Sequence, residues 1–239
     1  MIFSESVYTH HLNMRFFNLR ISRTEKSWWR ILLLVAVLYA LVACTRAPKM
    51  AGIAKGSVVL AFGDSVTFGT GAQPGEDWPT LLAEKTGWQI VNAGIPGDTA
   101  LNGKDRITAL LVEHRPALVI VEIGGNDFLR RRSQADVKQD IRQIIAASRS
   151  SGAAVVLVAV PEFSLFAVAA EKPSDAALYA ELGKEEKIPV IAGLFSGVLS
   201  QSDLRADTIH PNAKGYRVMA AGLFAELKKI GLYRDWGTN

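Results

Sequence analysis

The chain has 239 residues, which is enough for one domain of ordinary size with extensions and too short for two large ones. Hydrophobic residues make up 49% and charged residues 21%, a composition typical of a globular protein rather than a disordered one. The net charge of +4 stems largely from the first 43 residues, which hold five of the 27 basic residues but only two of the 23 acidic ones. The remaining 196 residues are nearly neutral, so their charge gives no indication of nucleic-acid binding.

The first 43 residues have the pattern of an export signal. A basic flank precedes an uncharged run over residues 31–43, which ends in small side chains. This run is short for a membrane-spanning helix, which needs about 20 apolar residues. Its end and the following Cys44 read Leu-Val-Ala-Cys, which resembles the lipobox of bacterial lipoproteins. The resemblance implies a lipoprotein signal peptide over 1–43, lipidation at Cys44 and a lipid-anchored protein on the periplasmic side of the cell envelope.

Two alternatives to the lipoprotein signal remain open, namely an uncleaved N-terminal anchor helix and an ordinary secretory signal. The chain has a single Cys, so no internal disulfide can form, even in an oxidising compartment. Residues 44–56 show no apolar period, and we expect them to form a short tether.

From residue 57 onward, apolar runs rich in β-branched residues alternate with helical patterns, as in βαβ units. Strands are expected at 57–62, 88–92, 117–123, 154–160 and 188–192. Helices are expected near 77–86, 103–115, 134–151, 174–187 and 212–230. Continuous apolar strands suit a parallel sheet covered by helices on both faces. The prediction is therefore one α/β domain over 57–233, a three-layer α/β/α sandwich, followed by a C-terminal tail over 234–239.

Four polar blocks stand out along this domain. Three of them, Gly63 to Val66, Gly94 to Gly97 and Gly124 to Asp127, follow the first three expected strands, and the fourth, Asp207 to His210, precedes the last expected helix. Ligands of such sheets bind at the carboxyl ends of the strands, so all four blocks can converge at one edge. Ester hydrolysis needs a nucleophile, a base, a carboxylate that orients the base, and donors for the oxyanion.

Ser65 is the candidate nucleophile, although a Ser at a strand-to-helix turn could merely cap the helix. His210 is the candidate base, because two of the other three His residues lie in the leader and His114 lies at an expected helix end. Asp207, three residues before His210, is close enough to orient the imidazole, and a simple turn or capping role is its alternative.

These blocks resemble those of the SGNH hydrolases, also known as GDSL-type esterases or lipases, over about residues 57 to 230. The similarity is greatest to bacterial periplasmic acyl-thioesterase/lysophospholipase and arylesterase members. It implies a flavodoxin-like, five-stranded parallel sheet and a serine mechanism without metal or other cofactor. The oxyanion donors it implies are the backbone N–H groups of Ser65 and Gly97 and the side-chain amide of Asn126. Gly94 is the nearby alternative donor, and Asn126 could instead close a turn. Val66 replaces the usual Leu at an apolar packing position.

Several further polar residues are expected to have supporting roles. Asp64 and Asp127 are interpreted as braces of their own loops. The three Arg residues at 130–132 are interpreted as a solvated turn, with attraction of anionic lipid headgroups as the alternative. The apolar segment 161–170 is expected to line an acyl groove through Phe163, Leu165 and Phe166, unless it begins a buried helix.

The sequence therefore predicts a serine ester hydrolase that acts on small acyl esters, thioesters or lysophospholipids. A carbohydrate O-deacetylase of the same fold is the alternative enzyme, and a non-catalytic ligand-binding module of the envelope is the alternative of another class. There is no G-x-S-x-G nucleophile elbow, no phosphate-binding loop and no cluster of residues with metal-ligand spacing. Oligomeric state is not indicated.

Overall fold

The computed structural model describes residues 52–162 and 173–234, together with Leu32, Leu33 and Val35. The expected lipidation site and acyl-groove residues lie outside the described residues, namely Cys44, Phe163, Leu165 and Phe166. The chain divides into two units, 1–48 and 49–239, and the second contains the folded domain. None of the helices in the described parts of the chain combines the length and the apolar character needed to span a membrane.

Five parallel strands form one sheet in the order β2-β1-β3-β4-β5. Their bounds are β1 Val58–Gly63, β2 Gln89–Gly94, β3 Leu118–Glu122, β4 Ala154–Val158 and β5 Val190–Ile191. The side chains of β3 are buried throughout, which explains its continuous apolar run. The five predicted strands are confirmed, with β3, β4 and β5 shorter than expected.

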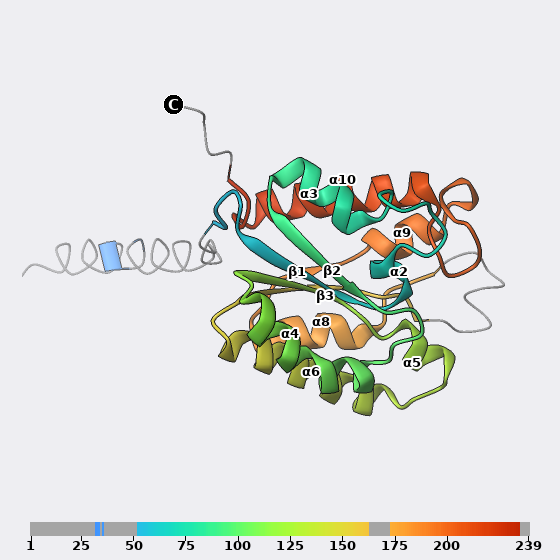
Figure 1. The fold of residues 1–239 in the computed structure, drawn as a ribbon. Coiled ribbons are helices and arrows are strands. Elements are labelled where there is room, and N and C mark those ends of the chain that lie inside the picture. Colours follow the sequence, from blue (N-terminus) through green and yellow to red (C-terminus); the bar gives the residue numbers. More distant parts are fainter. Residues whose placement is uncertain (1–31, 34, 36–51, 163–172, 235–239) are drawn as a thin grey trace, which may run out of the picture. The chain divides into compact units, whose positions relative to one another are not determined.

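Helices cover both faces of the sheet, so the predicted three-layer sandwich is confirmed (Figure 1). On one face lie α3 (Trp78–Thr86) and α10 (Ala213–Lys229), which pack against each other. On the other face lie α4 (Ala100–His114), α6 (Gln134–Ser150) and α8 (Ala177–Glu186). The buried positions of α6 recur at helical spacing, at Val137, Ile141, Ile144 and Ile145, and form the apolar stripe that packs into the core.

Short helices that the sequence did not predict follow three of the strands. They are α2 (Ser65–Phe68) after β1, α5 (Gly125–Leu129) after β3, and α9 (Leu194–Leu199) after β5, and a 3₁₀ helix, η1, spans Ser202–Leu204. One or two turns are too short for a periodic apolar pattern to emerge. Nevertheless, α2 and α5 carry the first and third polar blocks, and they therefore place Ser65 and Asn126.

The strand order reverses direction between β1 and β3. The chain passes from β1 to β2 on one side and then crosses to β3 on the other side of β1. The loops that follow β1 and β3 therefore diverge at this switch point, where open α/β sheets bind ligands. Ser65 and Asn126 both lie there.

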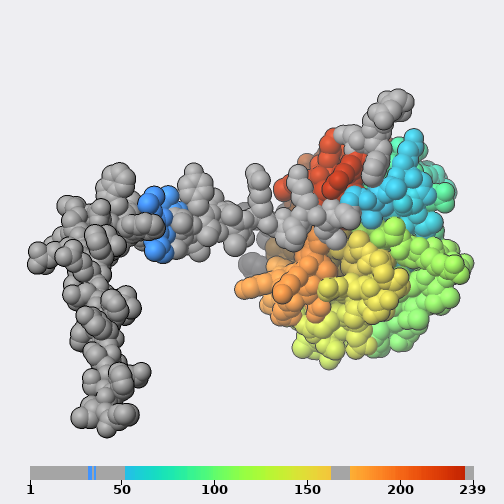
Figure 2. All heavy atoms as spheres, turned by 90° about the vertical axis from the view of Figure 1, so that its left-hand side faces the viewer, coloured from blue at the N-terminus to red at the C-terminus, as the bar shows by residue number. Residues whose placement is uncertain are grey.

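The packed domain begins before its predicted start at residue 57. Ile53 is buried in the core, and its N–H donates to the carbonyl of Leu232 at 2.7 Å. Seen from the edge at which the strands begin, the first described residues of the domain lie beside the end of α10 (Figure 2). The two ends of the domain are thus joined at the edge of the sheet opposite Ser65.

Candidate active site

Ser65 is the first residue of α2, immediately after the turn that ends β1. Asp64 caps this helix, because its side chain accepts a hydrogen bond from the N–H of Val66 at 3.1 Å. The capping role considered for Ser65 is therefore wrong, and Asp64 braces the turn as expected. The backbone N–H of Ser65, at the first helical position, has no acceptor within the helix. Ser65 thus presents a hydroxyl and a backbone donor that has no partner among the described residues.

The structure brings Ser65, His210 and Asp207 into one hydrogen-bonded series. His210 Nε2 lies 3.0 Å from Ser65 Oγ, although 145 positions separate the two residues in sequence. The other ring nitrogen, Nδ1, lies 2.8 Å from Asp207 Oδ2. The predicted convergence of the three side chains is confirmed. The order hydroxyl, imidazole, carboxylate is the geometry that nucleophilic catalysis by Ser requires.

The two oxygens of Asp207 have different partners. Oδ1 accepts the backbone N–H groups of Ile209 and His210, each at 2.8 Å, and so shapes the turn, while Oδ2 holds the imidazole. Partial burial raises the pKa of Asp207, but the bonds from His210 and from the two N–H groups outweigh it and the net pKa is lowered. The turn role and the orienting role therefore coexist in one ionised carboxylate.

The loop that carries His210 packs closely against the loop after α2. Gly71 has a φ of +99°, and a Cβ at this position would lie 2.4 Å from the carbonyl oxygen of Pro211, so only Gly fits. The hydroxyl of Tyr216, on α10, donates to the carbonyl of Thr70 at 2.7 Å. These contacts hold His210 beside Ser65, and nothing in the local sequence signals them.

The second polar block forms a tight turn over Ile95 to Asp98. The N–H of Asp98 donates to the carbonyl of Ile95 at 3.1 Å, and Gly97 has a φ of +84°. Pro followed by Gly with positive φ is the pattern of a type II turn, in which the central peptide has the opposite orientation to that of type I. Within the described residues, the N–H of Gly97 has no hydrogen-bond partner.

Gly94, the alternative donor, has a different role. Its N–H already donates to the side chain of Asn92 at 3.0 Å. A Cβ on Gly94 would lie 2.2 Å from the backbone nitrogen of Phe68 in α2. Gly94 therefore permits close packing of α2 against β2, and Gly97 is the Gly whose N–H is available.

Asn126, the second residue of α5, links the first three blocks. Its side-chain nitrogen donates to the carbonyl of Asp98 at 2.9 Å and makes a longer contact of 3.4 Å with Asp64 Oδ2. The alternative role as a local turn-closing residue is not what the structure shows, because both partners lie on other loops. The amide is thereby fixed between the Ser65 turn and the Gly97 turn.

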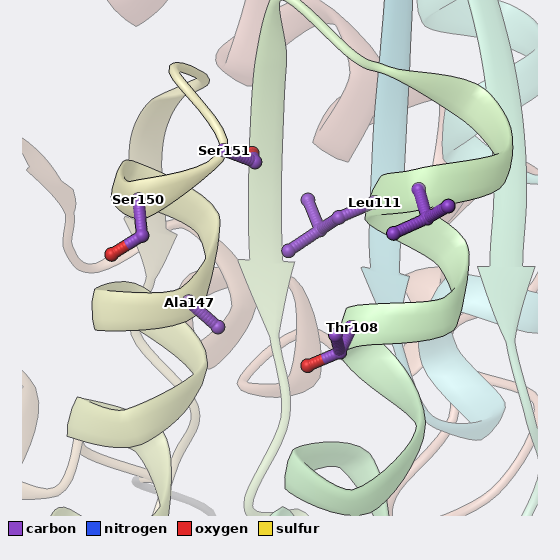
Figure 3. A pocket seen from close by; sticks show the side chains of 6 residues that line it. Thr108, Leu111, Ala147, Ser150 and Ser151 are labelled. Atoms are coloured by element: carbon purple, nitrogen blue, oxygen red, sulfur yellow. The ribbon is translucent and has the colours of Figure 1, made fainter.

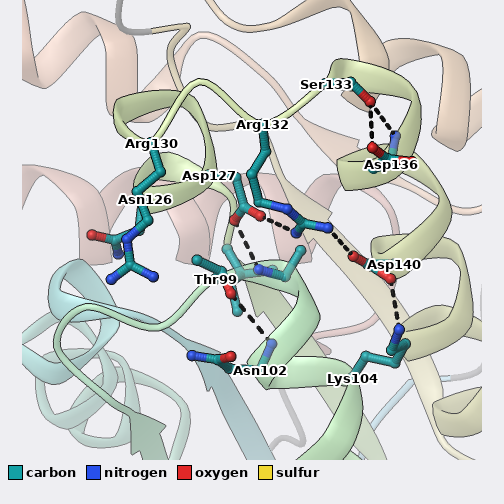
Figure 4. A network of polar contacts seen from close by, with 12 residues as sticks. Thr99, Asn102, Lys104, Asn126, Asp127, Arg130, Arg132, Ser133, Asp136 and Asp140 are labelled. Atoms are coloured by element: carbon teal, nitrogen blue, oxygen red, sulfur yellow. Dashed lines mark hydrogen bonds and ion pairs between the residues drawn. The ribbon is translucent and has the colours of Figure 1, made fainter.

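A second polar network holds the third block, Gly124 to Asp127, in place (Figure 4). The fully buried Asp127 accepts the N–H of Ala100 at 2.8 Å and pairs with Arg132 at 2.5 Å, so its predicted bracing role is confirmed. Arg132 also pairs with Asp140, which in turn pairs with Lys104. The interpretation of residues 130–132 as a solvated turn is therefore wrong for Arg132. Arg130 donates to the carbonyl of Gly97 at 3.0 Å.

A buried acid that the sequence did not single out lies beneath the nucleophile turn. Glu122, the last residue of β3, is 1% exposed, and its Oε2 accepts the hydroxyl of Thr67 in α2 at 2.7 Å. Burial first, and then the charge of Asp64, raise the pKa of Glu122 well above its usual range. Burial also raises the pKa of Asp64, to about 7. Asp64 accepts N–H groups from Val66 and Asn126, whereas Glu122 accepts only from Thr67 and its Oε1 has no partner among the described residues, so we assign the proton of this pair to Glu122.

No group of three or more metal-binding side chains occurs in the described part of the chain. A pocket of about 310 Å³ lies between α4 and α6, lined by Thr108, Leu111, Val112, Ala147, Ser150 and Ser151 (Figure 3). It contains none of the predicted site residues and lies toward the C-terminal ends of these helices, away from Ser65.

The fold and the hydrogen-bonded Ser-His-Asp set are those of a serine hydrolase with an α/β sheet. The profile of the GDSL-like lipase/acylhydrolase family matches residues 61–218. The chain therefore belongs to this family, the SGNH hydrolases, and is an enzyme that hydrolyses esters.

Named relatives support the same class. Esterase TesA of Pseudomonas aeruginosa is 32% identical over 186 residues, which is 74% of this chain and 90% of that protein. The Escherichia coli K12 protein called thioesterase 1/protease 1/lysophospholipase L1 is 33% identical over 184 residues, 74% of this chain and 86% of the relative. Among solved structures, a crystal structure of TesA superposes with a TM-score of 0.64 at 28% identity, covering 72% of this chain and 99% of the other.

Proposed function

We propose that Ser65, His210 and Asp207 are the catalytic triad of an esterase that cleaves acyl esters, thioesters or lysophospholipids through an acyl-enzyme. The observation that carries this proposal is the pair of contacts on His210, 3.0 Å to Ser65 Oγ and 2.8 Å to Asp207 Oδ2. A carboxylate on Nδ1 holds the proton there and leaves the lone pair of Nε2 facing the hydroxyl.

In the first half of the reaction, Ser65 Oγ attacks the acyl carbonyl while its proton passes to His210 Nε2. The imidazolium then gives this proton to the leaving alcohol or thiol as the bond to the acyl carbon breaks. In the second half, His210 takes a proton from water, the hydroxide attacks the acyl-enzyme, and the proton returns to Ser65 as the carboxylic acid leaves. Asp207 stays ionised throughout, which its lowered pKa favours.

The oxyanion is stabilised by the N–H groups of Ser65 and Gly97 and by the amide of Asn126. The short bond to Asp98 fixes one N–H of the Asn126 amide, and the second N–H, whose contact with Asp64 is long, is the one that would donate to the oxyanion. The positive φ of Gly97 supports its role, because it is typical of a type II turn. The N–H of Gly97 belongs to the central peptide of that turn, whose orientation therefore sets where the N–H points.

An apolar acyl group is the favoured substrate feature. The loops after the first three strands carry exposed apolar side chains, among them Phe68, Ile95 and Leu129. The names of the relatives, esterase and thioesterase/lysophospholipase, support the same substrate class. Phe163, Leu165 and Phe166, proposed from the sequence to line an acyl groove, lie outside the described residues. A carbohydrate O-deacetylase would instead prefer acetylated sugars over long acyl esters.

Covalent labelling with a fluorophosphonate tests the triad. The wild-type protein and the control Ser150→Ala, which removes an exposed hydroxyl on α6, should be labelled equally. Ser65→Ala should be neither labelled nor active. Labelling that persists in Ser65→Ala, or none in the wild-type protein, would refute the proposal, the second outcome favouring a non-catalytic binding module. A panel of esters with varied acyl length, together with acetylated sugars, then identifies the substrate class.

We also propose that the enzyme is anchored in the cell envelope by a lipid on Cys44. The basic flank, the apolar run and Cys44 support a lipoprotein signal and a periplasmic, membrane-anchored domain. Metabolic labelling with a palmitate analogue should mark the wild-type protein and leave Cys44→Ser unmarked. Label on the Cys44→Ser protein would place the lipid elsewhere, and an unlabelled but membrane-bound wild-type protein would favour an anchor helix.

A further inference from the structure

Arg106 connects the turn of the nucleophile to the turn of the Gly97 donor. It lies on α4, and its side chain is 20% exposed. Nη2 donates to the carbonyl of Gly63 at 2.9 Å, and Nε donates to Asp98 Oδ2 at 2.7 Å. Gly63 is the last residue of β1, two positions before Ser65, and Asp98 directly follows Gly97. One planar group therefore spans the two loops that supply the backbone oxyanion donors.

Three independent restraints fix this guanidinium. Besides its two hydrogen bonds, its Cζ lies 4.2 Å from the centroid of the Phe62 ring, which is fully buried in β1. Stacking on an aromatic face and donation from two different nitrogens are both properties of Arg that Lys lacks. Asp98 is itself buried, so its position depends on its partners rather than on solvent.

We infer that Arg106 is a positioning residue that sets the spacing between the Ser65 and Gly97 donors. This inference rests on the proposed function, since it concerns the oxyanion hole of that site. An oxyanion donor stabilises the transition state only if it lies at the right point in space, and a displacement of about 1 Å can cost about 10²-fold in rate. Loss of Arg106 should therefore lower kcat much more than it changes KM.

The test uses steady-state hydrolysis of a soluble short-chain p-nitrophenyl ester by the full-length protein. Arg106→Gln should lower kcat by about 10- to 100-fold while KM changes by less than about threefold. The kcat of Arg106→Lys should lie between those of the wild type and Arg106→Gln, because an ammonium keeps the charge but lacks the planar set of donors of a guanidinium. The matched control is Arg142→Gln on α6, whose side chain is 32% exposed and pairs with Glu185 and Glu186 on α8. Its kcat should stay within about twofold of wild type.

Chemical rescue separates positioning from simple loss of stability. Methylguanidinium should recover a large part of the activity of Arg106→Ala, whereas methylammonium at the same ionic strength should not. If Arg106→Ala does not fold, Asp98→Asn provides the second variant, since it weakens the same link and should lower kcat in the same way. The double variant Arg106→Gln/Asp98→Asn should lose less kcat than the two single losses multiplied together, because both substitutions break the same link.

The inference is overturned if Arg106→Gln keeps the kcat of the Arg142→Gln control. It is equally overturned if the loss of kcat follows the unfolding midpoint and methylguanidinium recovers nothing. Ser65→Ala in the same assay keeps the two proposals apart. If that variant remains active, the proposed triad fails, and the Arg106 effects belong to another mechanism. If it is inactive while Arg106→Gln equals its control, only the inference on Arg106 fails.

Discussion

The buried carboxyl of Glu122 predicts an unusual dependence of stability on pH. Its pKa in the folded protein lies well above the ordinary value of 4.5. Between these two pKa values, the folded protein binds one proton more than the unfolded chain, so the free energy of unfolding falls as pH rises. One extra bound proton corresponds to a slope of about 1.4 kcal/mol per pH unit. For a domain of this size, that slope lowers the unfolding midpoint by about 3 to 5 °C per pH unit.

Glu122→Gln tests this reasoning because it keeps the shape and removes the titration. The amide oxygen can accept the Thr67 hydroxyl, and the amide nitrogen occupies the place of Oε1, which has no partner among the described residues. Any cost of that buried nitrogen is independent of pH and cancels from the slope. We expect the wild-type protein to lose stability more steeply with rising pH than the variant does.

The measurement is urea unfolding of both proteins from about pH 7.5 to about 9, where Asp64 is mostly ionised in both states and the difference between the two curves isolates Glu122. Other titrating groups contribute equally to both curves and cancel. The control is Glu113→Gln on α4, whose side chain is 68% exposed, and its curve should run parallel to that of the wild type. Parallel curves for Glu122→Gln and the wild type would mean that Glu122 is already ionised when folded, and the assignment of the proton would be wrong.

Three substitutions at the proposed site have distinct expected outcomes in ester hydrolysis. Asp207→Asn should lower kcat by about 10⁴-fold, because an amide does not hold the imidazole in the tautomer whose Nε2 can accept the Ser65 proton, and an effect below about tenfold would leave Asp207 only its turn role. Asn126→Ala should lower kcat by about 10²- to 10³-fold while KM stays nearly constant. A rise in KM as large as the fall in kcat would instead indicate general damage to the loop. Gly97→Ala makes only an ordinary contact, with Arg130 Nη2 at 4.0 Å, but requires φ of +84°, so the turn should flip its central peptide, lowering kcat by about 10²-fold with a stability cost of only about 1 to 2 kcal/mol. Wild-type kcat in Gly97→Ala would exclude its N–H as a donor.

Local patterns were sufficient for the layers of the fold and for the three side chains that are hydrogen-bonded in series at Ser65. The run at 117–123 is apolar because β3 is covered on both faces, and the pattern of α6 is periodic because one stripe faces the sheet. The triad could be chosen because His210 is the only His outside the leader and helix ends, and because Asp207 lies one turn away. Family resemblance supplied the choice of Gly97 over Gly94.

Features that depend on contacts across the fold could not be read in this way. Glu122 stands in an apolar run, and its raised pKa follows from burial in the fold and then from the charge of Asp64, which lies more than 50 positions earlier. Arg106 looks like an ordinary helix residue until Gly63 and Asp98 are placed beside it. The type II turn is an exception, since the Pro96–Gly97 dipeptide is by itself a signal for such a turn.

The charges around Ser65 give the site a further constraint. Four acids, Asp64, Asp98, Glu122 and Asp127, lie around the point where an oxyanion would form, and the negative charge of each one is compensated. Arg106 pairs with Asp98, Arg132 pairs with Asp127, Glu122 carries a proton, and Asp64 accepts N–H groups of Val66 and Asn126. A single uncompensated carboxylate about 8 Å from the oxyanion would cost about 2 kcal/mol at an effective dielectric of about 20, or about 30-fold in rate. The partners of these acids therefore contribute to hydrolysis without contacting the substrate, because they keep negative charge from opposing the charge that develops on the acyl oxygen.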